Sequence, residues 1–393
     1  MDRTGEAGTV GRQRRRGLRT GFTTGACAAA ATAAACRILR GERVHAVTIT
    51  LPAGFRASFA VEGGWTDGRR AGAWVVKDAG DDPDVTHGAR IGAEVEPAQA
   101  GTRTGQSWTV TGPGLVARRL AGGAVVELRA GTGVGVVTRP GLGIPVGGPA
   151  INPVPRRMIA RAVREALGEP PPSVRVTISV HDGERLARRT LNGRLGIIGG
   201  LSILGTTGVV RPYSTAAWRA SVLQGMDVAA AAGCAEVVAC TGGRSEAYAR
   251  AFRPDLPEVA FIEMGEFTGH ILRRARELEL EAVTLAGMIG KLSKIACGHL
   301  MTHAAGNQVD LGYLAGVCLR AGGPRELAEA ISQANTARHA QELAQAADLR
   351  RFFDLVADDA RRACRERIGA RPRVEVLLFD FDGALLGRAA DVT

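Results

Sequence analysis

The sequence GRLGIIGGLSILGTTGVVRPYS occupies residues 193–214, near the middle of the 393-residue chain. It places glycines among isoleucine, leucine and valine, and it ends in the hydroxyls of Thr206 and Thr207 and the cation of Arg211. Glycines let a backbone approach a ligand closely, at a cost in conformational entropy. The same residues also suit a buried strand and turn whose glycines serve close packing. We expect this stretch to connect two halves of the chain, and both interpretations of its glycines stay open.

The chain length and the cysteine pattern bound the class of protein. At 393 residues the chain exceeds what one hydrophobic core usually fills, so we expect two domains. No CxxC pair occurs among the seven cysteines, which are scattered at positions 27, 36, 234, 240, 297, 318 and 364. This pattern is typical of reduced thiols in a cytoplasmic protein and predicts neither disulfides nor structural zinc.

Basic residues outnumber acidic ones by 50 to 39, which gives a formal net charge of +11. Such a balance raises nucleic acid as a partner. The excess is spread along the chain without interleaved aromatic residues, however, and a polyanionic small molecule accounts for a basic pocket equally well. We therefore expect no nucleic-acid partner. Residues 1–17 are predicted to be a disordered basic tail, and we expect neither a signal peptide nor a membrane span.

Two patterns of strands and helices divide the chain. Residues 18–213 begin with an alanine-rich helix, capped by Thr23 or Thr24 and ended by Gly41, and they predict an α+β domain with a mixed or antiparallel sheet. Residues 214–323 alternate strand and helix, which predicts a Rossmann-like parallel α/β domain. Residues 324–393 are predicted to form C-terminal helices and a strand that returns to the first domain. We expect residues 193–214 to form the floor of the cleft between the domains.

Several matches to known motifs are set aside. FDFDG at 379–383 imitates the nucleophile strand of haloacid-dehalogenase-type phosphatases, but only ten residues follow it. GMIGKLSK at 287–294 lacks the glycine spacing and the hydroxyl of a phosphate loop, so it is predicted to be a strand–helix turn. GTGVGV at 131–136 precedes a strand rather than a helix. Cys297, His299 and His303 lack the spacing and acidic surroundings of a metal site; we predict no protein-bound metal.

The densest group of titratable residues is KDAGDDPDVTHG, at 77–88. Crowded, partly buried carboxylates repel one another, which would raise some of their pKa values and make one a general base near neutrality. A solvated turn capped by aspartates is the alternative. Because the loop follows a strand, where sites often lie, we predict a catalytic role for its acids and histidine: Asp78, Asp81, Asp82, Asp84 and His87.

Other loops offer binding groups. The rigid segment TRPGLGIPVGGPAINPVPRRM, at 138–158, carries guanidinium groups that suit carboxylate ligands. TGGRSEAYA from Thr241 offers backbone N–H groups at a helix start, and IEMGEFTGH from Ile262 offers two acids after a strand. The candidate substrate-binding residues are Arg139, Arg156, Arg157, Arg211 and His299. The candidate cofactor-binding residues are Gly205, Thr206, Thr207, Gly242, Gly243, Glu263 and Glu266.

Six blocks in order resemble the CbiD family of cobalt-precorrin-5B C(1)-methyltransferases: LRTGFTTGACAAAA, KDAGDDPDVTHG, GVGVVTRPGLGIPVG with PAINPVPRRM, RLGIIGGLSILGTTGVVRPYS, IEMGEFTGH and GMIGKLSKIACG. The resemblance runs from about Leu18 to the C-terminal strand. One departure is Gly148, where the family commonly has glutamate, so that position receives no catalytic role.

The resemblance implies a cytoplasmic enzyme of anaerobic cobalamin biosynthesis. Such an enzyme moves a methyl group from S-adenosyl-L-methionine to ring carbon 1 of a cobalt corrinoid, giving cobalt-precorrin-6A. The corrinoid brings the cobalt, and its ionised acetate and propionate groups would meet the arginines. The methyl donor is a sulfonium cation, which nearby carboxylates would stabilise. Whether the protein forms a homo-oligomer is left open.

Two other function classes remain as alternatives. The alternating second half also suits a nicotinamide-dependent oxidoreductase, and the arginine-rich tail suits a basic RNA-binding protein. Separate titrations with NADH and with S-adenosylhomocysteine discriminate the first alternative, and deletion of residues 1–16 discriminates the second.

Overall fold

The computed structural model describes residues 17–98, 105–302 and 308–391. Nearly all of the predicted basic tail, residues 1–17, therefore lies outside the described residues, as does His303. The chain divides into two compact units, Met1–Thr215 and Ala216–Thr393, here called unit 1 and unit 2. Both units combine helices with β-sheets, which confirms the mixed α/β class. No helix among the described residues is long and apolar enough to cross a membrane.

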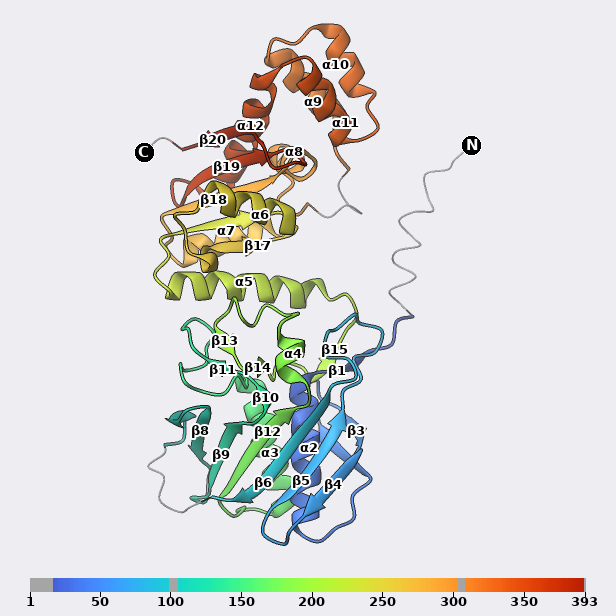
Figure 1. Cartoon of the computed structure of the whole chain (residues 1–393), viewed down its shortest axis with the longest axis vertical. Coiled ribbons are helices and arrows are strands. Elements are labelled where there is room, and N and C mark those ends of the chain that lie inside the picture. Colours follow the sequence, from blue (N-terminus) through green and yellow to red (C-terminus); the bar gives the residue numbers. More distant parts are fainter. Residues whose placement is uncertain (1–16, 99–104, 303–307, 392–393) are drawn as a thin grey trace. The chain divides into compact units, whose positions relative to one another are not determined.

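A buried helix, α2 (Thr24–Leu39), forms the centre of unit 1 (Figure 1). Its alanines favour a helix, and the Thr23 side chain caps it by accepting a hydrogen bond from the Ala26 N–H at 3.2 Å. The helix packs between strands β5 and β6 on one side and helix α3 (Pro153–Leu167) on the other. Small alanine side chains on every face let both layers approach closely, which explains why thirteen of its residues are buried.

The sheet of unit 1 has seven strands in the order β4-β5-β6-β12-β9-β8-β7. Strands β12 and β9 pair in parallel and all other neighbours pair antiparallel, so the sheet is mixed. Strand β12 alternates buried and half-buried residues, as expected where one face meets the core. The strands are β4 (Gly63–Thr66), β5 (Ala71–Val76), β6 (Arg90–Pro97), β7 (Thr109–Gly112), β8 (Leu115–Arg119), β9 (Val125–Ala130) and β12 (Val174–Val180). A separate hairpin joins β2 (Ala46–Thr50) to β3 (Arg56–Ala60), and α4 (Gly183–Ala187) follows β12.

Residues 193–214 form three two-residue strands, each paired with a different segment of unit 1. These are β13 (Ile197–Ile198) with β11 (Val136–Val137), β14 (Gly200–Leu201) with β10 (Gly133–Val134), and β15 (Val209–Val210) with β1 (Gly21–Phe22). A Cβ at Gly200 would lie 2.2 Å from the Gly133 backbone, and one at Gly205 would lie 2.5 Å from Thr23. At these two glycines, close packing rather than ligand access explains the residue type.

The sheet of unit 2 has five strands in the order β17-β16-β18-β19-β20. The first four are parallel and β20 is antiparallel. Within β16, Val237 and Ala239 join one apolar cluster while Val238 and Cys240 join another, so both faces of the sheet are covered. The strands are β16 (Glu236–Cys240), β17 (Phe261–Glu263), β18 (Ala282–Met288), β19 (Arg373–Phe379) and β20 (Leu385–Ala390).

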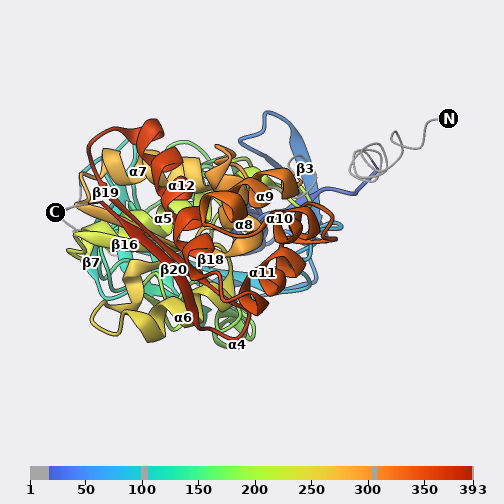
Figure 2. The same ribbon diagram turned by 90° about the horizontal axis from the view of Figure 1, so that it is seen from above.

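Helices cover the two faces of this sheet. Helix α6 (Gly243–Phe252) packs on one face, and α12 (Arg350–Ile368) packs on β19 and β20 from the other. Figure 2 shows α9 (Leu311–Arg320), α10 (Arg325–Ser332) and α11 (Ala337–Ala346) grouped beside α8 (Ile289–Ala296). The remaining helices are α5 (Thr215–Ala231) and α7 (Thr268–Glu277), and a 3-10 turn, η1 (Glu258–Ala260), precedes β17.

The last part of the chain corrects one prediction. The strand VEVLLFD, residues 374–380, is predicted to return to the first domain, but β19 instead pairs in parallel with β18 along seven residues. The physical reason is that β19 ends in four consecutive apolar residues, Val376 to Phe379, all buried, and a position inside the covered sheet of unit 2 buries both faces of this run. Residues 324–393 therefore complete unit 2 rather than unit 1.

Candidate functional site

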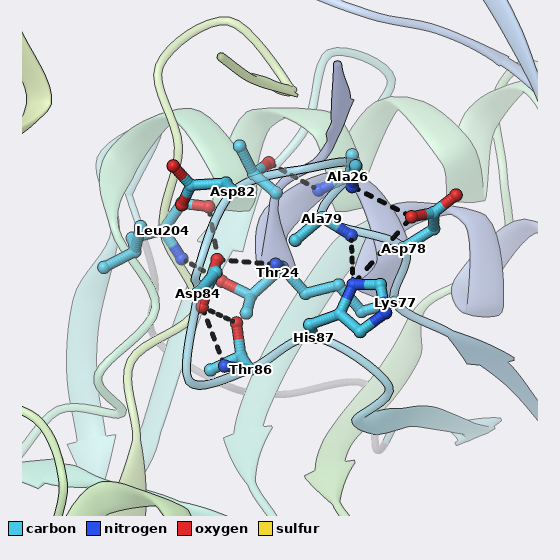
Figure 3. A network of polar contacts seen from close by, with 12 residues as sticks. Thr24, Ala26, Lys77, Asp78, Ala79, Asp82, Asp84, Thr86, His87 and Leu204 are labelled. Atoms are coloured by element: carbon cyan, nitrogen blue, oxygen red, sulfur yellow. Dashed lines mark hydrogen bonds and ion pairs between the residues drawn. The ribbon is translucent and has the colours of Figure 1, made fainter. Parts of the chain in front are cut away.

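Residues 77–88, here called the acidic loop, connect β5 to β6 in unit 1 (Figure 3). Each of its four aspartates accepts a hydrogen bond from a residue other than an aspartate. Asp78 forms an ion pair with Arg19, whose second guanidinium nitrogen lies 3.0 Å from the same carboxylate. The Asp81 carboxylate accepts the Arg19 backbone N–H at 2.6 Å. These two acids therefore hold the segment that leads into β1 and α2.

The ion pair of Asp84 is more buried than that of Asp78. The Lys77 ammonium, only 1% exposed, lies 2.7 Å from the Asp84 carboxylate. The other Asp84 oxygen accepts the N–H and the hydroxyl of Thr86, at 2.7 and 2.6 Å (Figure 3). Burial alone would raise the pKa of Asp84, but the charge of Lys77 and these hydrogen bonds lower it overall.

The remaining two groups of the loop, Asp82 and His87, each use one polar atom in a hydrogen bond within the chain. One Asp82 oxygen accepts the Tyr213 N–H at 2.8 Å, and this fixes the left-handed backbone of Tyr213, whose φ is 54°. The Nδ1 atom of His87 accepts the Ala79 N–H at 3.1 Å, so the neutral ring carries its proton on Nε2. That Nε2 has no hydrogen-bond partner among the described residues, and the side chain is half exposed.

The prediction that crowding raises carboxylate pKa values is wrong for Asp78 and Asp84. Hydrogen bonds from Arg19 and from the Gly80 N–H lower the pKa of Asp78 to about 2, and the pKa of Asp84 is also lowered. The physical reason is that each carboxylate accepts hydrogen bonds from a cation or an N–H group, and these favour its charged form. Asp78 and Asp84 are therefore weak bases near neutrality.

The predicted donor residues of unit 1 lie on an exposed turn. Gly205 adopts a φ of 123° beside Thr23, and Thr206 and Thr207 are both exposed. The Thr207 hydroxyl accepts the Val209 N–H at 3.2 Å. The turn follows Leu204, whose carbonyl accepts the Gly25 N–H at 3.0 Å, so the first turn of α2 and this turn are adjacent.

The four arginines predicted to bind substrate divide into two kinds. Arg156 is 3% exposed and donates to the carbonyl oxygens of Ile151 and Pro149, and burial lowers its pKa to about 10. Its predicted contact with substrate is therefore corrected to a structural contact with the chain itself. Arg139, half-buried, donates to the Arg194 carbonyl at 3.1 Å. Arg157 and Arg211 are exposed, without an ion pair to any described residue.

Unit 2 contains a pocket of about 530 Å³ where strands β16 and β18 end. Gly242 and Gly243, predicted from the sequence, line it at the start of α6. The lining residues are Thr241, Gly242, Gly243, Arg244, Ser245, Met288, Gly290, Lys291, Lys294, Val309, Thr336, Ala337, Arg338 and Phe381. We call this feature the basic pocket, because four of these residues are lysine or arginine.

Two motifs that the sequence analysis set aside contribute to this pocket. GMIGKLSK is indeed a strand–helix turn, from β18 into α8, yet its Lys291 and Lys294 line the pocket, and Phe381 comes from FDFDG. One signal could have found the lysines. The chain has only three lysines among its 50 basic residues, namely Lys77, Lys291 and Lys294. Where arginine supplies nearly every cation, a lysine marks a place that suits a compact ammonium group.

The other candidates in unit 2 are placed as follows. Glu263 is exposed at the end of β17 and Glu266 is 6% exposed, and both act electrostatically on Lys291, whose pKa is nonetheless lowered by burial. His299 is exposed and does not line the basic pocket. Among the described residues, no group of three or more metal-binding side chains is close enough to hold an ion.

The fold and the sites define a mixed α/β protein in which charged side chains gather where strands end. The CbiD family model matches residues 11–212, and the model of the CbiD C-terminal domain matches residues 301–390. The chain belongs to the CbiD family.

Several relatives support this assignment. A cobalt-precorrin-5B C(1)-methyltransferase from Salinispora tropica is 51% identical over 369 residues, covering 93% of this chain and 91% of the relative. Proteins of the same name from Thermus thermophilus and Agrobacterium fabrum are 50% and 47% identical, each covering 94% of this chain and 93% of the relative. A solved structure, the cobalamin biosynthesis protein cbiD from Archaeoglobus fulgidus, is 28% identical with a TM-score of 0.36, covering 72% of this chain and 81% of that chain.

Proposed function

We propose that this protein methylates carbon 1 of cobalt-precorrin-5B, with S-adenosyl-L-methionine as methyl donor, and so produces cobalt-precorrin-6A in anaerobic cobalamin biosynthesis. The observation that carries the proposal is about 50% identity, over more than nine-tenths of the chain, to proteins named for this reaction. The parallel strands of unit 2 support a Rossmann-like arrangement. We expect the enzyme to act in the cytoplasm.

The chemistry requires alignment and the loss of a proton. Alignment of the donor methyl with the ring carbon contributes about 7 kcal/mol or more to lowering the barrier in favourable cases. Transfer of a methyl cation to carbon leaves an extra positive charge until a proton departs, so a base completes the step. We assign this base to Asp82, because one of its oxygens is anchored by the Tyr213 N–H while the other has no partner among the described residues.

The neighbouring groups take supporting roles in this proposal. Asp78, Asp81 and Asp84 are held by Arg19 and Lys77, so they fix the shape of the acidic loop. His87 presents an Nε2–H that donates to substrate rather than accepting a proton. Glu263 and Glu266 suit the sulfonium of the donor, since carboxylates stabilise a nearby cation. Gly205, Thr206 and Thr207 stay predictions for the donor, and Arg139, Arg157, Arg211 and His299 for the corrinoid.

The test is methyl transfer itself. The purified protein is incubated with cobalt-precorrin-5B and S-adenosyl-L-methionine whose methyl group carries ¹³C, and the corrinoid is analysed by mass spectrometry and NMR. The expected result is one labelled methyl group on carbon 1, formed together with S-adenosylhomocysteine. A label on another carbon, or no transfer by protein that binds both substrates, would overturn the proposal.

A further inference from the structure

The basic pocket concentrates positive charge. Arg244, Lys291, Lys294 and Arg338 all line it, and none of its described lining residues is acidic. Two of these cations already interact with other groups of the chain. Lys291 donates to the carbonyl oxygens of Thr241 and Gly265, and Arg338 pairs with Glu342 at 2.9 Å. Arg244 and Lys294 have no side-chain partner among the described residues.

Lys294 is the more informative of the two. The residue is only 9% exposed, yet neither a carboxylate nor a carbonyl of the described chain receives its ammonium. Burial of an unpaired charge is costly, and folded proteins normally supply a partner. Lys77, which is 1% exposed, has such a partner, because its ammonium lies 2.7 Å from the Asp84 carboxylate. Since Lys294 lines the pocket, a bound anion would supply the partner that the chain does not.

The start of helix α6 adds donors to the same pocket. The first N–H groups of a helix have no acceptor within it, and they carry the positive end of the helix dipole. The Ser245 hydroxyl accepts the Gly242 N–H at 3.1 Å, while Gly243 and Arg244 occupy the next positions and line the pocket. A Cβ built on Gly242 or Gly243 would meet no atom within 4 Å, so this backbone is open to a ligand.

The position of the pocket in the sheet is also characteristic. From β16 the chain passes through α6 to β17 on one side, and from β18 it reaches β19 on the other. The strand order therefore reverses between β16 and β18, and ligands of open α/β sheets bind in the crevice at the carboxyl ends of such strands. Thr241 follows β16 and Met288 ends β18, and both line the pocket.

We propose that the basic pocket binds ionised carboxylates of the corrinoid substrate, and not the methyl donor. This inference rests on the proposed function. S-adenosyl-L-methionine brings one carboxylate together with an ammonium and a sulfonium, so four surrounding cations would oppose its net positive charge. A corrinoid with several acetate and propionate groups brings multiple anions. Gly242 and Gly243 are thereby reassigned from donor to substrate.

The experiment measures two affinities on the same full-length variants by calorimetry. The corrinoid probe is cobyrinic acid, whose acetate and propionate groups are free carboxylates, with its neutral methyl ester as ligand control. The donor probe is S-adenosylhomocysteine. The variants are Lys294→Met and Arg244→Gln. Arg250→Gln is the matched control, since Arg250 lies on α6, pairs with Glu258 and does not line the pocket.

We expect each pocket variant to weaken binding of cobyrinic acid by about tenfold or more, as for charge-assisted hydrogen bonds, with little change for S-adenosylhomocysteine. The methyl ester should bind weakly to every form. Loss of donor affinity with unchanged binding of cobyrinic acid would overturn the assignment, and so would unchanged affinities for both probes. These outcomes are distinct from failure of the proposed function, in which the wild-type protein transfers no methyl group.

Discussion

The acidic loop of unit 1 and the basic pocket of unit 2 differ in whether their charged groups have partners within the chain. In the acidic loop every carboxylate meets a cation or an N–H group, and the pKa values of Asp78 and Asp84 fall. In the basic pocket Lys294 is buried without a partner in the described chain. Apart from the second oxygen of Asp82, the carboxylates of the loop thus find their partners within the chain, whereas the charge of Lys294 in the pocket would find its partner in a bound anion.

This difference separates two meanings of a charged cluster. Charges that satisfy one another contribute to stability and hold a loop in one shape. A buried charge without a partner destabilises the fold, and a ligand of opposite charge can supply the missing interaction. We therefore expect substitutions of the paired groups of the acidic loop, Lys77, Asp78 and Asp84, to act largely on folding and geometry. Substitution of Asp82 should act on turnover, and substitutions in the basic pocket should act on binding.

The largest expected effect is on stability, at Lys77. The variant Lys77→Met leaves the Asp84 carboxylate partly buried without its cation, so we expect the free energy of unfolding of unit 1 to fall by about 3 kcal/mol. Chemical denaturation followed by circular dichroism and tryptophan fluorescence measures it. The double variant Lys77→Met/Asp84→Asn removes both charges and should recover at least half of the loss.

An exposed ion pair provides the control for that measurement. Arg161 and Glu165 lie one turn apart on α3, both about half exposed, and Arg161→Gln should cost less than about 0.5 kcal/mol. If Lys77→Met cost no more than this control, the acidic loop would not be the self-satisfied network that the comparison requires.

The second effect separates geometry from catalysis within the acidic loop. Asp82→Asn keeps an oxygen for the Tyr213 N–H, so the fold should persist, but an amide does not take up a proton. We expect the rate constant of methyl transfer to fall by about 100-fold, which is typical of the loss of a general base. Single-turnover kinetics with the corrinoid measures it, and Glu165→Gln serves as the charge control. Unchanged turnover would remove Asp82 from the mechanism.

Much of the fold is predictable from local patterns. The cap at Thr23, the alanine run and the positive φ of Gly41 define α2 without any tertiary information. Strands β12 and β16 are likewise predictable from their own residues. The neighbouring strand with which a strand pairs cannot be predicted in this way, because an apolar run such as the second half of β19 fits any sheet covered on both faces. The misplacement of β19 in the first domain follows from that ambiguity.

The site was predictable in its residue types but not in its electrostatics. The sequence places four aspartates together. It does not show that Arg19 forms an ion pair with Asp78 or that Lys77 forms one with Asp84. Arg156 illustrates the same limit, because carbonyls of its own loop take up its guanidinium. The sequence indicated Gly242 and Gly243 of the basic pocket but not its cations, because Arg244, Lys291, Lys294 and Arg338 come from three separate segments of the chain.

A third and smaller effect is the pH dependence of stability at Asp78. Its pKa is about 2 in the folded protein against a usual value near 3.8, so its contribution is full above that usual value and disappears as the pH falls toward 2. Asp78→Asn should therefore flatten the decline in unfolding free energy over this range, by less than about 1 kcal/mol because the pair with Arg19 is half exposed. Parallel denaturation curves at pH 5, 4 and 3 would show the change in slope, and identical slopes would mean that Arg19 does not stabilise the carboxylate.

The smallest effect sharpens the contrast between partnered and unpartnered charge inside unit 1 itself. Arg211 is exposed and has no ion pair to a described residue, unlike the buried Arg156. Arg211→Ala should leave the unfolding free energy unchanged and raise KM for the corrinoid about threefold, since an exposed ion pair with substrate is worth little. Arg69→Ala, on an exposed turn between β4 and β5, is the matched control. If Arg211→Ala instead weakened only S-adenosylhomocysteine binding, Arg211 would belong with Gly205, Thr206 and Thr207 on the donor side, and its assignment to the corrinoid would be wrong.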